Sequence, residues 1–128
     1  MIINRKRIEK LISSFLIDHN LVEYSLGELR IVDDTSPNND TIATITINQV
    51  TKHFFIRLWS REVGSYREAM AAIIHELTHL YLHEVSDFYE YMDQNGAQDH
   101  IKKHYITMYE TITCRLAKLF EQHYLEGV

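Results

Sequence analysis

The sequence predicts a single α+β domain, and three observations carry that prediction. Apolar residues recur with helical spacing near both ends of the chain, whereas a middle segment alternates between apolar and polar residues. The 128 residues, 45% of them hydrophobic, suffice for one modest core. One proline, four glycines and no repeats leave no obvious linker. We therefore expect one domain over residues 1–128: an N-terminal helix, a small mostly antiparallel sheet, a second helix and a long C-terminal helix.

The first predicted elements are an amphipathic helix over residues 4–19 and a short strand over residues 28–32 that follows Gly27. The helix is predicted because its apolar residues follow the i, i+3, i+4, i+7 pattern of one helix face. These residues are Ile8, Leu11, Ile12, Phe15 and Leu16.

Two further strands are expected to form an antiparallel hairpin. The loop before them, residues 33–40, is rich in Asp, Asn, Ser and Pro, and a solvated turn is favoured there over a metal site. Isoleucine and alanine alternate with threonine over residues 41–48, and apolar residues fall on one face of residues 53–59. The short link between the two segments favours a hairpin.

The second helix begins at Ser65, where Ser65-Tyr66-Arg67-Glu68 has the sequence of a capping box. It is apolar on nearly every side and should be buried, and we expect it to end near Val85 or Asp87. After a turn-like segment at residues 93–96, the long C-terminal helix is expected from about residue 98 to residue 123.

The buried helix contains an HExxH motif, His75-Glu76-Leu77-Thr78-His79. Histidines four positions apart project from the same helix face, so both rings can reach one metal ion. Glu76 is then placed to hold and deprotonate a water bound to that metal, as in zinc hydrolases. Random placement would give this motif in roughly a few per cent of such chains. The alternative without a metal is a pair of hydrogen-bonded histidines in the core. The apolar helix favours the metal, because buried polar groups need a partner.

A catalytic zinc site needs a third protein ligand. The metzincin arrangement is excluded, because Leu82 and Val85 occupy the positions of its glycine and its third histidine. Glu110 is the predicted ligand, because a carboxylate on the apolar face of the last helix is costly unless it is paired or metal-bound. His100 is the main competitor, since some HExxH enzymes use a third histidine at comparable range.

The remaining residues of interest lie on or near the last helix. Cys114 is expected in the core and His83 at the end of the motif helix, while His100 and His104 are favoured as exposed residues over a second metal site. One of these histidines, or Tyr105, is a candidate for stabilising an oxyanion. The expected inward face is Ile106, Tyr109, Ile112, Leu116 and Phe120, flanked by Thr113, Ala117 and Leu119, and the solvated face is His100, His104, Thr107, Thr111, Arg115 and Lys118.

The stretch from His75 to His83, HELTHLYLH, resembles the HELGHLLLH-type stretch of the ImmA/IrrE family of small bacterial and phage metallopeptidases. The resemblance spans about residues 40–120. It implies a zincin-like fold of the gluzincin type, a Zn²⁺ ion, and a glutamate on a following helix as third ligand, a position that Glu110 fits. It also implies a cytoplasmic peptidase with a protein substrate, by analogy a transcriptional repressor.

The chain departs from that family at three places. Thr78 replaces a small residue, residues 111–117 lack the family's Ala-Asn-x-Phe-Ala segment, and the basic-aromatic segment before the motif helix is missing. SprT-like zincins, which use a third histidine, are the nearest alternative and would make His100 the ligand. A catalytically inactive zincin-fold protein that binds a partner is the alternative function.

The composition argues against several classes of protein. A net charge of −5 without a Lys/Arg cluster argues against nucleic-acid binding. No apolar run approaches the length of a membrane span, and the N-terminal residues lack a signal-peptide pattern. Cys114 is the only cysteine, which excludes an intrachain disulfide and makes a reducing cytoplasm the expected compartment.

Overall fold

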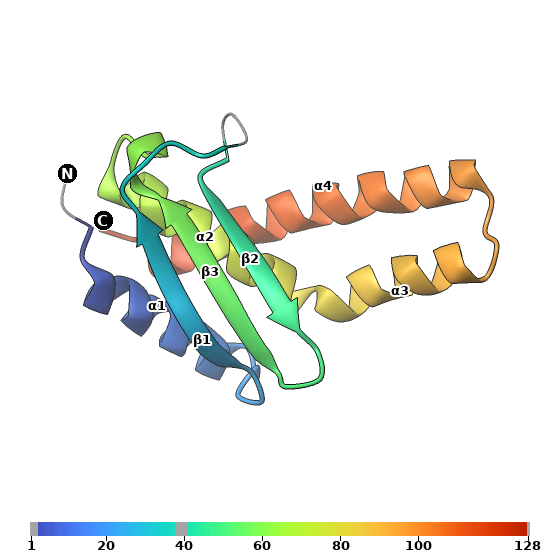
Figure 1. Ribbon diagram of the computed structural model, residues 1–128, viewed down its shortest axis with the longest axis horizontal. Coiled ribbons are helices and arrows are strands. Elements are labelled where there is room, and N and C mark those ends of the chain that lie inside the picture. The colour runs from blue at the N-terminus through green and yellow to red at the C-terminus, as the bar shows by residue number, and fades with distance from the viewer. Residues whose placement is uncertain (1–2, 38–40, 128) are drawn as a thin grey trace.

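The computed structural model describes residues 3–37 and 41–127, with only the backbone of residues 84–89. Its described part is α+β, with a small mixed sheet and four α-helices (Figure 1). The elements are α1 (Arg5–Asp18), β1 (Ser25–Val32), β2 (Ala43–Asn48), β3 (His53–Trp59), the short 3-10 helix η1 (Ser60–Glu62), α2 (Tyr66–Tyr81), α3 (His83–Gln94) and α4 (Asp99–Tyr124).

The sheet has the strand order β1-β3-β2, so β3 is its central strand. β2 and β3 form the expected antiparallel hairpin, in which Ala43 pairs with Leu58 and Asn48 with His53. β1 runs parallel to β3, so the prediction of a mostly antiparallel sheet is wrong. The reason is that β3 inserts between the two strands that precede it, and β1 and β3 then point the same way.

β1 begins three residues earlier than expected and continues through Gly27. Its pairing with β3 shifts between Leu26 and Glu28, where the strand has a bulge. A Cβ atom at Gly27 would lie 2.6 Å from Cε1 of Phe55. Gly27 is therefore not a strand boundary but the place where the Phe55 ring comes close to the β1 backbone.

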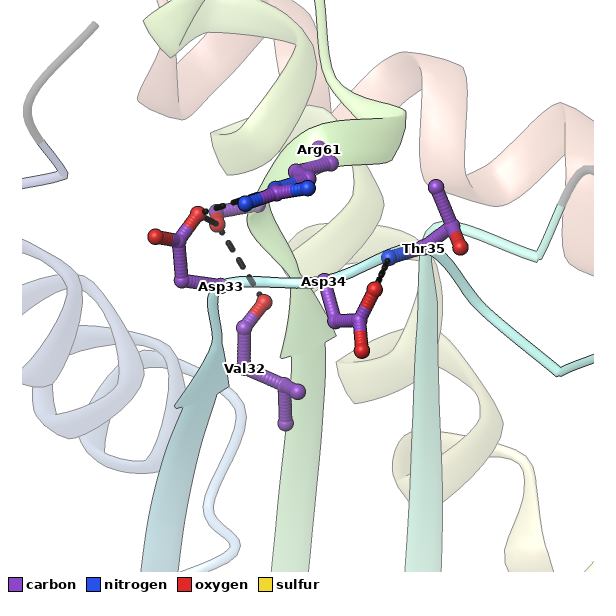
Figure 2. Close-up of polar contacts among 6 residues, drawn as sticks. Val32, Asp33, Asp34, Thr35 and Arg61 are labelled. Atoms are coloured by element: carbon purple, nitrogen blue, oxygen red, sulfur yellow. Dashed lines mark hydrogen bonds and ion pairs between the residues drawn. The ribbon is translucent and has the colours of Figure 1, made fainter.

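The segment after β1 turns through local contacts of acidic side chains (Figure 2). The Asp34 carboxylate accepts a hydrogen bond from the Thr35 backbone N–H at 2.7 Å. Asp33, whose side chain is 85% exposed, forms an ion pair with Arg61 at 3.5 Å. Described residues 33–37 form the predicted solvated loop except at Ser36, which is buried and donates its backbone N–H to the Glu62 carboxylate at 3.1 Å. The rest of the predicted loop, residues 38–40, lies outside the described residues.

The helices α1, α2 and α4 lie on one side of the sheet, and α3 with the first half of α4 projects beyond it (Figure 1). α2 contacts β2, β3, α1 and α4, so it is the centre of the core. Alternate residues of β3 point into this core because strand side chains alternate between faces. The largest fully buried side chains include Phe15, Phe54, Ile56, Leu58, Ile73, Ile74, Leu77 and Leu80.

The motif helix is shorter than predicted and is followed by a helix that was not expected. α2 ends at Tyr81, Leu82 forms its C-cap, and α3 starts at His83. No glycine or proline marks this break, which is why the sequence suggested a helix continuing to Val85 or Asp87. A signal for α3 existed in the i, i+3, i+7 spacing of Val85, Phe88 and Met92.

α4 matches its predicted bounds within one residue, but its inward face is narrower than expected. Thr113 and Ala117 are buried, whereas Ile106, Ile112 and Leu119 are 42%, 47% and 60% exposed. The expected core position of Cys114 is also wrong, because this residue is exposed. The predicted solvated face is confirmed: His100, His104, Thr107, Thr111, Arg115 and Lys118 are all exposed. None of the described helices is long and apolar enough to cross a membrane.

Candidate functional site

The helix that carries the motif is fixed at its first turn by the predicted cap. The Ser65 side chain accepts a hydrogen bond from the Glu68 backbone N–H at 3.1 Å. The Glu68 carboxylate in turn accepts one from the Gly64 N–H at 3.1 Å. The first bond satisfies a free N–H group of the first turn, and the second ties the residue before the cap to that turn. α2 therefore starts at a defined residue, and with it the rotation of the motif about the helix axis is set.

His75 and His79 lie on the same side of α2, one turn apart. Their ring centroids are 5.0 Å apart and the rings are nearly perpendicular. Both residues are half-buried, while Leu77 and Thr78 between them are fully buried. The Thr78 hydroxyl donates to the Ile74 carbonyl at 2.8 Å, so its polar atom is satisfied without a ligand. The motif thus presents its histidines and buries its spacer residues.

Glu76 is half-buried on the same helix, beside a hollow of about 210 Å³. Burial raises the pKa of Glu76 to about 7, and the nearby charge of Glu110 acts in the same direction. The hollow is lined by Thr41, Ile42, Ala43, Ala72, His75 and Glu76. It lies between the start of the edge strand and the motif helix, so His75 and Glu76 border a space that a ligand can enter.

Tyr109 of α4 contacts the second motif histidine. Its hydroxyl lies 3.0 Å from Nδ1 of His79. Burial raises the pKa of Tyr109, the charge of Glu110 also raises it, and a hydrogen bond with Thr113 lowers it, so the phenol stays neutral at neutral pH. Burial lowers the pKa of His79, His75 lowers it further and Glu110 opposes both. The pair therefore consists of a neutral phenol and a predominantly neutral imidazole, the form that binds metals.

Helical periodicity predicts Tyr109 on the inward face of α4 but indicates no role for it. The signal that could have found it is its place next to Glu110, on a helix face expected to meet the motif helix. The sequence alone does not show which turn of α4 lies against His79. That information comes from the packing of α2 on α4.

Glu110 lies close enough to the motif to affect the pKa values of Glu76 and His79, although it is exposed. The structure thus brings the four predicted site residues to one region. His100 is exposed in the first turns of α4, about 15 Å along the helix axis from Glu110. Cys114 is exposed as well, and His83 opens α3 beyond the end of the motif helix.

The donor types around the motif fit zinc, which is bound by histidine nitrogen and carboxylate oxygen. Their arrangement fits in part. Among the residues that the structure describes, no group of three or more His, Cys, Asp or Glu side chains is gathered closely enough to hold a metal ion. The histidine pair is in place, and Glu110, with its exposed side chain, is the donor that would have to turn inward.

The hollow adjoins the edge strand β2, which contacts the motif helix. β2 is an edge strand, and within residues 3–37 and 41–127 no other strand pairs with its outer side. β3 is enclosed between β1 and β2, so it has no free edge to which a peptide could add as a further strand. β2 does have one, and it adjoins the hollow.

Comparison with known protein families, curated proteins and solved structures finds no match to this chain.

Proposed function

We propose that this protein is a zinc-dependent metallopeptidase that hydrolyses peptide bonds of a protein substrate. One observation carries the proposal: the HExxH motif lies on a buried helix, with Glu76 beside a hollow and with Glu110 on the helix packed against it. The resemblance to the ImmA/IrrE family supports the same function and the gluzincin set of zinc ligands. A zincin-like fold is part of this proposal.

His75, His79 and Glu110 would hold the ion, with one coordination position left open. When bound, zinc acts as a Lewis acid that polarises the scissile carbonyl and acidifies water. Glu76 would accept the proton of the attacking water and then donate it to the leaving amine. Tyr109 would hold His79 in the tautomer with hydrogen on Nδ1, because its oxygen can accept that hydrogen and leave Nε2 for the metal.

The substrate would bind as an extended segment along the free edge of β2. Strand addition supplies main-chain hydrogen bonds without demanding a particular sequence, and the adjoining hollow would receive a substrate side chain. This placement brings the backbone of the segment beside Glu76. By analogy with the resembling family, a transcriptional repressor in the cytoplasm is the proposed substrate.

The decisive test compares Glu76→Gln with wild type after zinc reconstitution. The variant should retain about one zinc per chain and lose hydrolysis of a casein substrate, because the amide cannot accept the proton. Elemental analysis of His75→Ala and Glu110→Ala should show loss of zinc, whereas His100→Ala should keep it. Full hydrolysis by Glu76→Gln would contradict the mechanism, and loss of zinc in His100→Ala alone would favour the SprT-like ligand set.

The exposure of Glu110 favours one other function, a zincin-fold protein that binds a partner without hydrolysing it. A solvated carboxylate is a weaker third ligand than a buried one. Such a protein would bind zinc weakly or not at all, would cleave no tested substrate, and would be indifferent to Glu76→Gln. The same set of variants therefore separates the two functions.

A further inference from the structure

The face of the sheet turned away from the helices carries a groove. In Figure 1 this is the face towards the viewer, and none of the described helices lies over it. The groove has a volume of about 280 Å³ and is built by all three strands. Its lining side chains include Glu28, Arg30, Thr44, Thr46, Phe55 and Arg57.

Two arginines stand side by side in this groove. Arg30 of β1 is the direct partner of Arg57 in β3, and Arg57 is in turn the partner of Thr44 in β2. Neighbouring strands are about 5 Å apart, and like charges directly opposite each other destabilise a sheet. The net charge of the chain is −5, so this paired positive charge is a local feature and not part of a generally basic surface.

Among the residues that line the groove, little negative charge compensates the two arginines. Glu28 is the one carboxylate among the lining residues, and its contact with Arg30 is 3.8 Å long with both side chains more than 60% exposed. Exposed pairs of this kind contribute little stability. Arg57 lies over the Trp59 ring at 5.9 Å, a contact that positions the guanidinium without neutralising it.

Next to the arginines, the groove has an aromatic floor. Phe55 is 44% exposed and lies between Glu28 and Thr46 in the row that follows the arginine row. Its ring packs on Gly27, where any other residue would place a Cβ atom in contact with it. The groove therefore combines two guanidinium groups, two threonine hydroxyls and a flat apolar surface.

We propose that this groove binds an acidic segment of a partner protein, with its carboxylates held by Arg30 and Arg57. The planar guanidinium group matches a carboxylate with two parallel hydrogen bonds, and two adjacent groups match two carboxylates of an extended chain. Threonine hydroxyls donate to the same oxygens, and Phe55 contacts the intervening side chain. This binding goes beyond hydrolysis at the HExxH motif and does not depend on it, because the groove is on the opposite face of the sheet.

A nucleic acid is the competing occupant, since arginine and an exposed aromatic ring on a sheet also suit a single strand. The charge of the whole molecule disfavours it. A polyanion that extends past the groove would meet a protein with a net charge of −5, whereas a short acidic segment places its charges only at the two arginines.

The test is fluorescence anisotropy with a labelled eight-residue peptide of alternating glutamate and serine, a matched peptide with glutamine in place of glutamate, and labelled oligo-dT of equal length. Wild type should bind the glutamate peptide saturably, and salt should weaken that binding. Arg30→Gln and Arg57→Gln should each weaken it by about tenfold, since each removes a charge-assisted hydrogen-bond donor. Arg115→Gln removes the same charge from the exposed face of α4 and should change the affinity less than about twofold.

Each other outcome overturns the proposal. Equal losses in Arg57→Gln and Arg115→Gln would show a general charge effect, and no binding by wild type would exclude the site. Tighter binding of oligo-dT than of the peptide, lost in the same variants, would assign the groove to nucleic acid. Unchanged melting temperatures of the variants confirm that they fold, and Glu76→Gln should bind the peptide as wild type does, which separates this result from the test of hydrolysis.

Discussion

At the scale of single residues, the motif side chains are of two kinds. His75, Glu76 and His79 are half-buried: the first two line the hollow, and His79 contacts the Tyr109 hydroxyl. Leu77 and Thr78 are fully buried, and the Thr78 hydroxyl is hydrogen-bonded within the helix. The hydrogen bond of the Thr78 hydroxyl to the Ile74 carbonyl removes the cost of burying this polar group.

Removing the Tyr109 hydroxyl should weaken zinc binding without unfolding the protein. In Tyr109→Phe, Nδ1 of His79 loses its partner at 3.0 Å, and loss of such an outer partner costs about 10- to 100-fold in metal affinity. A chromophoric chelator in competition with the protein measures the dissociation constant.

Tyr81→Phe is the matched control for this prediction, because it removes a hydroxyl only two residues after His79, at an exposed position. Its zinc affinity should stay within about twofold of wild type. Equal affinities for wild type and Tyr109→Phe would show that Tyr109 does not position His79.

At the scale of elements, the sequence predicted α1, β3 and α4 well because each has a regular pattern over its whole length. It failed where the decisive contact is long-range. β1 is parallel because it pairs with β3, a strand distant in sequence. β1 also extends through Gly27, where the Phe55 ring of β3 packs closely. The motif is evident from its spacing alone. Periodicity predicted Glu110 on the apolar face of α4, which is wrong because the residue is exposed, although it lies near the motif. The contact of Tyr109 with His79 required the packing of α4 on α2.

The junction between α1 and α4 is held by a cluster of rings around His19. The imidazole lies 4.3 Å from the Phe15 ring and 4.4 Å from the Phe120 ring, and its Nε2 is 3.1 Å from the Tyr124 hydroxyl. Tyr81 of α2 contacts the same imidazole at 5.5 Å. His19 therefore connects three helices through contacts that suit its neutral form.

Acid should loosen this junction. Burial lowers the pKa of His19 from its ordinary value of 6.5, Asp18 opposes that change and His123 adds to it. Since the folded-state pKa is the lower one, the contribution of His19 to stability is complete above pH 6.5 and is lost as the pH falls through the lowered value. The melting temperature of His19→Phe should therefore fall less than that of wild type between about pH 7 and pH 5.

An exposed histidine provides the control for this pH effect. His104→Gln removes a titrating group from the solvated face of α4 and should keep the wild-type pH dependence. If His19→Phe and wild type lose stability in parallel over the same pH range, His19 is not the group responsible.

At the scale of the whole molecule, the candidate metal ligands join the two helices α2 and α4, and a ligand bound there would stabilise the packing between them. The two proposed binding regions are separated by the sheet. One lies between β2 and α2, and the other lies on the face that carries no helix. The two proposed ligands would therefore not compete for the same surface.

Zinc should stabilise the whole chain, and a chelator should reverse that effect. A ligand at about 100 times its dissociation constant stabilises a protein by about 2.7 kcal/mol, which corresponds to about 10 °C in melting temperature for a domain of this size. Differential scanning calorimetry with added zinc and then with EDTA measures the shift.

The ligand variants tell a specific metal effect from a general one. Glu110→Ala should lose most of the zinc-dependent shift, and His100→Ala should retain it. A shift that persists in His75→Ala would mean that zinc stabilises the protein from another place.

The projecting pair of helices has a practical consequence. The turn that joins α3 to α4 contains Gly96, which has a φ of 75°. No neighbouring atom lies within 4 Å of the position that a Cβ atom would take there. An ion pair between Lys102 and Asp93, 2.7 Å long, connects the two helices beside the turn. Exposed turns of this kind tolerate insertions. An affinity tag or a fluorophore inserted between Gly96 and Ala97 would stand at the tip of the arm, away from the sheet. Cellular partners could then be captured on beads with both the hollow and the groove left open.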